Sequence, residues 1–144
     1  MFEPHKRIVL TASNDIECYF INAAHLHATN PAVSIARIEE LIAQATAETA
    51  DKSVEALVNQ RTAEAFRIRQ AGGPQPNHGA IAVQAAADYA ANPAAFRRGK
   101  VVMGRLSALL QQEMGANPWI YYPSEHLRTA ELTAVAAEIW PAAA

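Results

Sequence analysis

Apolar residues recur at intervals of three and four along most of this chain, which is the spacing of one face of an α-helix. Asn14 with Glu17 three residues later is typical of a helix start, and Asn30 followed by Pro31 is typical of a helix end. The pattern predicts six helices, over about 14–29, 31–50, 51–71, 80–91, 93–114 and 124–140.

Turn residues separate the predicted helices. Gly72–Gly79 forms a loop between two helical halves, and each half is too small to be an independent domain, so residues 1–144 are expected to form one domain. Gly115 follows the fifth helix as a C-cap. Two short runs, Arg7–Thr11 and Trp119–Tyr122, favour extended backbone. The predicted fold is therefore an all-α bundle of five to six helices with at most two short strands.

Two of the predicted helices are unusual, one in its composition and one in having a charged residue within its apolar stripe. The helix over 80–91 is almost entirely small residues, so we expect it to be central in the bundle or clamped at an interface. Arg61 lies within the apolar stripe of the helix over 51–71, between Leu57 and Ala65. Because an unpaired buried charge is costly, Arg61 is expected to pair with a carboxylate or carbonyls, or to reach past the helix edge.

Composition narrows the class of protein. The chain has 144 residues, of which 32 are alanine and 6 glycine, a ratio that favours helix. Its formal charge of −2 disfavours binding to nucleic acid or to an anionic membrane. The single cysteine, Cys18, allows no internal disulfide, and Met1–Leu10 lacks the apolar run of a secretory signal. We therefore expect a cytoplasmic protein that does not associate with membranes.

A polar stripe along the first predicted helix contains Cys18 and His25, residue types of a thiol-dependent enzyme. Residues seven apart on a helix are about 10.5 Å apart, so these two side chains cannot bond directly. His25 and His27 point about 160° apart and cannot share a metal ion. His27 falls on the apolar face as a core histidine. The stripe is otherwise the solvated face of an amphipathic helix, and no metal or cofactor is expected.

Basic residues gather at the start of the fifth helix, at Arg97, Arg98, Lys100 and Arg105. Such a group could bind phosphates in a nucleic-acid-binding module, or it could be solvated or paired with acids. No phosphate loop, nucleophile elbow, HExxH or CxxC motif occurs in the chain, so no known catalytic mechanism is indicated.

Two features predict a contact surface. The fifth helix has interior glycines, Gly99 and Gly104, which are most easily retained where a backbone approaches another group. Its flat second face carries Arg97, Val101, Gly104 and Ala108. The second feature is Trp119–Tyr122: in an extended segment Trp119 and Tyr121 point one way and Ile120 and Tyr122 the other. The candidate binding residues are thus Arg97, Arg98, Val101, Arg105, Trp119, Tyr121 and Tyr122.

The favoured hypothesis is a non-catalytic helical protein that acts by protein–protein binding or self-association, as a regulator, inhibitor or assembly subunit, including accessory and phage factors. The alternatives are a nucleic-acid-binding module that uses the Arg97–Arg105 group and a small enzyme that uses Cys18 and His25.

Overall fold

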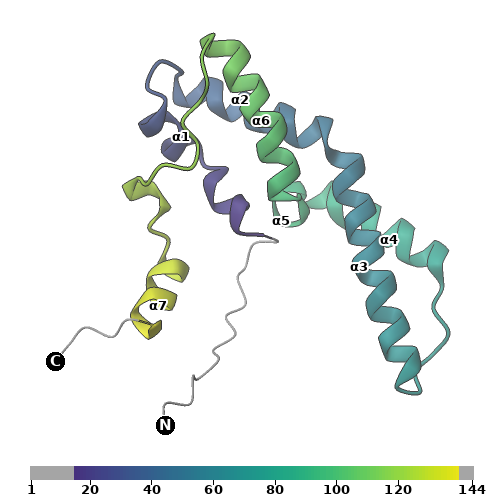
Figure 1. The fold of residues 1–144 in the computed structure, drawn as a ribbon. Helices are drawn as coiled ribbons and strands as arrows, with labels where there is room; N and C mark the ends of the chain where they lie inside the picture. Colours follow the sequence, from purple (N-terminus) through teal and green to yellow (C-terminus); the bar gives the residue numbers. More distant parts are fainter. Residues whose placement is uncertain (1–14, 140–144) are drawn as a thin grey trace.

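Helices account for all the regular structure of residues 15–139, the part of the chain that the computed structural model describes (Figure 1). The elements are η1 (Ile16–Phe20), α1 (Ala23–Thr29), α2 (Ile35–Glu48), α3 (Ala50–Gln70), α4 (His78–Ala91), α5 (Pro93–Phe96), α6 (Gly99–Met114), η2 (Glu125–Leu127) and α7 (Ala130–Ile139), where η denotes a 3-10 helix. The all-α bundle is confirmed. Trp119–Tyr122 is irregular rather than a strand, and Arg7–Thr11 lies outside the described residues.

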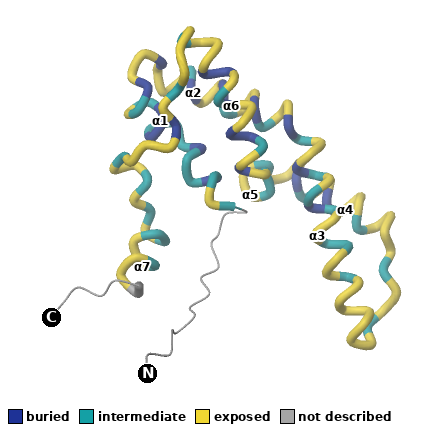
Figure 2. Tube along the Cα trace, in the orientation of Figure 1, coloured by how far each residue is buried: buried dark blue, intermediate teal, exposed yellow. Residues whose placement is uncertain are grey.

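The core forms where α2 and α6 pack together beside α1 (Figures 1 and 2). Leu26, Ile38, Leu41, Leu106 and Leu110 are fully buried there. The spacings of three between Ile38 and Leu41 in α2 and of four between Leu106 and Leu110 in α6 place each pair on one face, so the periodicity of the sequence is realised in this part of the bundle. Burial of an aliphatic side chain of this size contributes about 1.5–3 kcal/mol, which makes this cluster the main source of stability.

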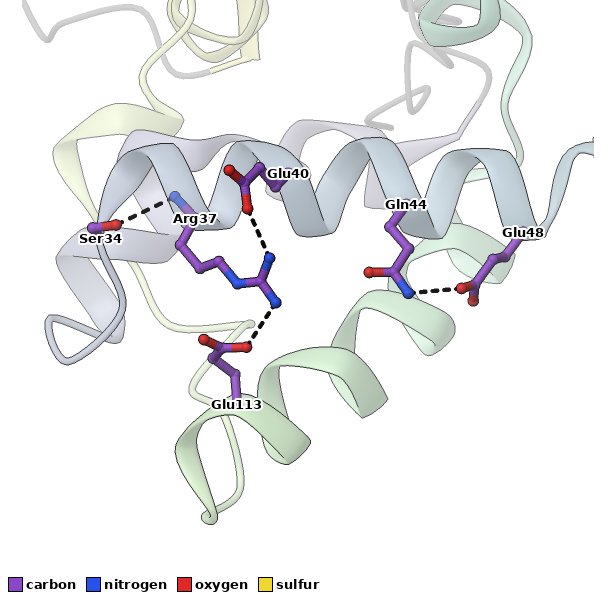
Figure 3. A network of polar contacts seen from close by, with 6 residues as sticks. All are labelled: Ser34, Arg37, Glu40, Gln44, Glu48 and Glu113. Atoms are coloured by element: carbon purple, nitrogen blue, oxygen red, sulfur yellow. Dashed lines mark hydrogen bonds and ion pairs between the residues drawn. The ribbon is translucent and has the colours of Figure 1, made fainter.

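Ion pairs line the outer edge of the α2–α6 contact (Figure 3). Arg37 on α2 donates to Glu40, at 2.7 Å, and to Glu113 of α6, at 3.0 Å. At the other end of α2, Glu48 accepts from Arg105 of α6 and from Gln44. These hydrogen bonds lower the pKa values of Glu113 and Glu48. The pairs are exposed, so they fix the register of the two helices more than they stabilise the fold.

The first predicted helix is broken, contrary to the sequence pattern. Ile21 and Asn22 interrupt it, and the Asn22 side chain caps α1 by accepting from the backbone N–H groups of Ala24 and His25 at 3.0 and 3.2 Å. Asparagine favours such caps because its side chain competes with the helix for backbone donors. The break turns η1 onto the start of α6. There the backbone of Cys18 approaches Gly99 so closely that a Cβ on Gly99 would lie 2.6 Å from the Cys18 nitrogen.

The fifth predicted helix is broken as well. Arg97 and Arg98 are extended between α5 and α6, and the Arg98 N–H donates to the Ser53 hydroxyl at 3.2 Å. Ser53 is fully buried within α3. Gly115 ends α6 at φ +67°, as predicted, because this left-handed conformation strains residues that carry a Cβ.

The paired helices α3 and α4 extend from the body as an arm whose far half is exposed (Figures 1 and 2). The predicted loop over 72–79 lies at its tip, although α4 already begins at His78. Arg61 pairs with Asp88 across the two helices at 2.7 Å, which confirms its predicted carboxylate partner. Ile68, toward the tip, is half-exposed, whereas Leu57 nearer the body is buried.

Candidate functional site

The exposed aromatic residues after α6 form the clearest candidate surface. Trp119, Tyr121 and Tyr122 are 53%, 62% and 51% exposed. The rings of Trp119 and Tyr122 lie 4.5 Å apart between centroids, and Tyr121 packs edge-on against Phe20 of η1 at 5.2 Å. We call these four residues the aromatic patch. The patch brings together three of the residues that the sequence predicted for binding.

Hydrogen bonds from α1 and the residue that follows it hold the backbone of the patch in place. Asn30, which is fully buried, accepts from the Trp119 N–H at 2.7 Å and donates to the Trp119 carbonyl at 3.0 Å. His25 donates from Nε2 to the Ile120 carbonyl at 2.8 Å, and the Ile120 side chain is itself in the core. The aromatic side chains are therefore exposed on a fixed segment and not on a loose loop.

This anchoring overturns the predicted alternation of side chains. Ile120 alone turns inward, whereas Trp119, Tyr121 and Tyr122 are all exposed. The backbone bends after Ile120, so Trp119 and Tyr122 meet on the outside and do not point to opposite faces.

The sequence assigned the core histidine to the wrong position. His25 is fully buried, whereas His27 is half-buried and donates from Nδ1 to the Val33 carbonyl at 2.8 Å. A carbonyl only accepts, so the bond to Ile120 requires a hydrogen on Nε2 of His25, and in the neutral ring Nδ1 accepts from the Ser124 hydroxyl at 2.8 Å. The error follows from the break at Asn22, which rotates α1 relative to η1.

The binding residues predicted on the fifth helix do not form one surface, because they contact different parts of the molecule. Arg97 is half-buried and donates to the Ile21 carbonyl at 3.5 Å, close to the Phe20 end of the aromatic patch. Arg105 pairs with Glu48, and Val101 is half-buried. Arg98 projects into solvent between α5 and α6. Two of the basic residues thus serve internal contacts, which weakens the case for a single phosphate-binding surface.

Cys18 has the surroundings of a structural thiol. It is buried and donates to Asp15 at 3.2 Å. Burial and the hydrogen bond to Asp15 both raise the pKa of the thiol, the opposite of what a nucleophilic cysteine needs. Both ring nitrogens of His25 are engaged by Ile120 and Ser124. Within residues 15–139 no three acidic, histidine or cysteine side chains are grouped as metal ligands.

Sequence reasoning missed an apolar groove between α2 and the α4–α5 junction. Its volume is about 590 Å³, and its walls include Ala43, Ala47, Tyr89 and Ala94, with Arg97 among the lining residues. The Thr46 hydroxyl is buried here, with no hydrogen-bond partner among the described residues. The alanines of α2 that line the groove did not indicate it in the sequence, because small residues are also common on solvent-exposed helix faces.

Searches of protein-family models, curated proteins and solved structures find no match to this chain. In the part of the chain that the structure describes, no helix is both long and apolar enough to cross a membrane.

Proposed function

We propose that this chain is a non-catalytic, protein-binding helical protein whose partner docks on the aromatic patch. The observation that carries the proposal is the anchoring of the backbone at Trp119 and Ile120 by the buried Asn30 and His25, within a segment that exposes three aromatic side chains. Tyrosine and tryptophan are enriched at binding hot spots, and a surface held in its binding conformation loses little entropy on association. Roles as a regulator, inhibitor or assembly subunit of the cytoplasm belong to the same proposal.

The patch is large enough for this role. An aromatic side chain buries about 150–250 Å², so three that are half-exposed leave roughly 300 Å² of surface open. At about 25 cal/mol per Å², covering that surface supplies up to roughly 7 kcal/mol before the costs of association. A hot spot of this size is typical of the centre of a specific interface.

The test is affinity purification of the full chain from its native cell, followed by affinity measurement with the purified partner. Trp119→Ala or Tyr121→Ala should weaken binding by about thirtyfold, the effect of losing roughly 2 kcal/mol at a hot spot. Phe66→Ala is the matched control, because Phe66 is an exposed aromatic residue on the arm, away from the patch. Binding that survives the patch substitutions, or is lost equally in the control, would refute the proposal.

Thermal unfolding of the same variants separates binding from folding. Exposed side chains contribute little to stability, so the patch variants should unfold within about 0.5 kcal/mol of the wild type. A large loss of stability with unchanged binding would mean that the aromatic residues are packing residues. Arg98→Glu tests the nucleic-acid alternative: loss of binding to generic DNA or RNA in this variant alone, and only at low salt, would favour that alternative.

A further inference from the structure

Glu17 of η1 brings a carboxylate to one end of the aromatic patch. In a 3-10 helix, side chains three residues apart lie on the same side, so Glu17 lies beside Phe20 along η1. Phe20 in turn packs against Tyr121, at 5.2 Å between ring centroids. Partial burial and the charge of Glu17 both raise the pKa of the Tyr121 hydroxyl, in agreement with this placement. A negative charge therefore lies next to two of the four rings of the patch.

The Glu17 carboxylate has no ion-pair partner within residues 15–139. Glu48 and Glu113 each pair with an arginine, whereas no arginine, lysine or histidine of this part of the chain pairs with Glu17. Arg97, which also contacts this region, donates to the Ile21 carbonyl at 3.5 Å. Glu17 is half-buried, so its charge is less well screened by water than that of a fully exposed side chain. A cation from outside the chain would find this carboxylate available.

The segment that follows the patch does not offset this charge. η2 and the next residue carry Glu125, His126 and Arg128, whose charges cancel when the histidine is neutral. The aromatic rings add to the negative character of the surface, because the face of a ring is the negative part of its quadrupole. The three residues of the patch that follow α6 are each more than half exposed, so ring surface is open to solvent. Glu17 and the patch thus form a surface that is both apolar and electronegative.

We propose that the protein partner of this surface places an arginine side chain on Tyr121 and Glu17. This inference rests on the proposed function and adds to it the chemistry of the partner. A guanidinium group stacks on aromatic faces and donates paired hydrogen bonds to a carboxylate. The apolar stem of arginine also covers ring surface that is otherwise in contact with water. Arginine is the side chain that matches both the rings and the charge of this surface.

Other occupants match only part of this surface. A proline-rich segment also binds to surfaces lined with aromatic rings, but it carries no group that pairs with Glu17. An acidic partner, including the phosphates of a nucleic acid, is repelled by Glu17. A second copy that docks through the same patch brings a second Glu17 to the interface and no cation to offset it. Charge complementarity therefore favours a basic protein segment over each of these.

Titration of the isotope-labelled full chain with N-acetyl-arginine amide, followed by NMR, tests the proposal. The backbone amide signals of residues 119–122 should shift with this probe and much less with N-acetyl-citrulline amide, which has nearly the same shape without the charge. Glu17→Gln should weaken binding of the arginine probe about fivefold, the equivalent of about 1 kcal/mol for one partly exposed charge pair. Glu55→Gln is the matched control, because Glu55 is an exposed glutamate on α3 and its substitution removes the same charge from the arm.

Four results of this titration would overturn the proposal. The first is the absence of any shift at residues 119–122. The second is an equal response to the arginine and citrulline probes, which would mean that the surface binds apolar groups without regard to charge. The third is equal weakening by Glu17→Gln and Glu55→Gln, which would reduce the effect to the net charge of the protein. The fourth is a shift of the same signals with protein concentration alone, which would assign the patch to a second copy.

Affinity measurements with the purified partner separate this inference from the proposed function. Glu17→Gln, with circular dichroism showing it folded, should weaken binding about fivefold at about 0.1 M salt, and the difference from the wild type should shrink at about 1 M salt, where charges are screened within about 3 Å. If Trp119→Ala weakens binding and Glu17→Gln does not, the patch binds its partner without an arginine, and this inference alone fails. Binding that survives both substitutions refutes the proposed function as well.

Discussion

Gly99 and Gly104 provide a test of the fold in which the same substitution has opposite effects on one helix. A Cβ on Gly99 would lie 1.9 Å from the Asp15 carboxylate, 2.6 Å from the Cys18 nitrogen and 2.8 Å from its sulfur. The carboxylate can rotate away, but it would then lose its hydrogen bonds with the Cys18 thiol and the Lys100 N–H. The Cys18 nitrogen belongs to the backbone, so η1 as a whole must shift.

An additional methyl group that forces a backbone shift costs about 1–3 kcal/mol, more than alanine gains over glycine in helix propensity. With that gain subtracted, a net cost of up to about 2 kcal/mol remains, so we expect Gly99→Ala to lower the midpoint of thermal unfolding by up to roughly 8 °C. Gly104 is exposed, and a Cβ there meets no atom within 4 Å. Gly104→Ala should instead stabilise the protein by about 0.5–1 kcal/mol, since alanine loses less backbone entropy on folding.

Thermal and urea unfolding followed by circular dichroism measure both effects in one experiment. The double variant should show the sum of the two changes within about 0.5 kcal/mol if the two sites are independent. Stabilisation by Gly99→Ala would refute the packing of η1 against the start of α6. Destabilisation by Gly104→Ala would mean that α6 has a neighbour at this position that the structure of one chain does not contain.

Three further predictions concern the bond between Asn30 and Trp119, the Cys18 thiol and the arginine–carboxylate pairs. Asn30→Ala leaves the Trp119 N–H without its acceptor and should cost about 1–3 kcal/mol, with faster amide exchange at Trp119; unchanged exchange would contradict the anchoring. Cys18 should react slowly with a thiol reagent near pH 8 until the protein is unfolded, because burial raises its pKa, and equal rates in both states would show it to be accessible. The carboxylates paired with arginine have lower pKa values in the folded protein than in the unfolded chain, so the free energy of unfolding should stay constant from pH 7 to about 5 and fall below about pH 4; a rise on acidification would contradict this sign.

Local signals along the chain are sufficient to predict the helical class and most helix positions. Helical periodicity, alanine content and the helix-ending residues Pro31 and Gly115 are local signals. They suffice for this purpose because a helix is formed by hydrogen bonds between residues close in sequence. A partner for Arg61 could also be predicted, because an unpaired charge near the core is costly whichever carboxylate pairs with it. The structure shows that this carboxylate is Asp88. The exposure of some residues of Trp119–Tyr122 was predicted from the alternation of side chains in an extended segment, but that alternation is wrong: Ile120 alone turns inward.

Contacts between distant segments set where the helices are interrupted and which side chains they bury. The breaks at Asn22 and Arg97 depend on the approach of η1 to Gly99 and on the bond from Arg98 to Ser53, contacts between segments 45 or more residues apart. Once α1 is separated from η1, its rotation is set by packing, so His25 enters the core and anchors the aromatic patch. Helical periodicity describes the faces of one continuous helix, so it carries no information about where that helix is broken.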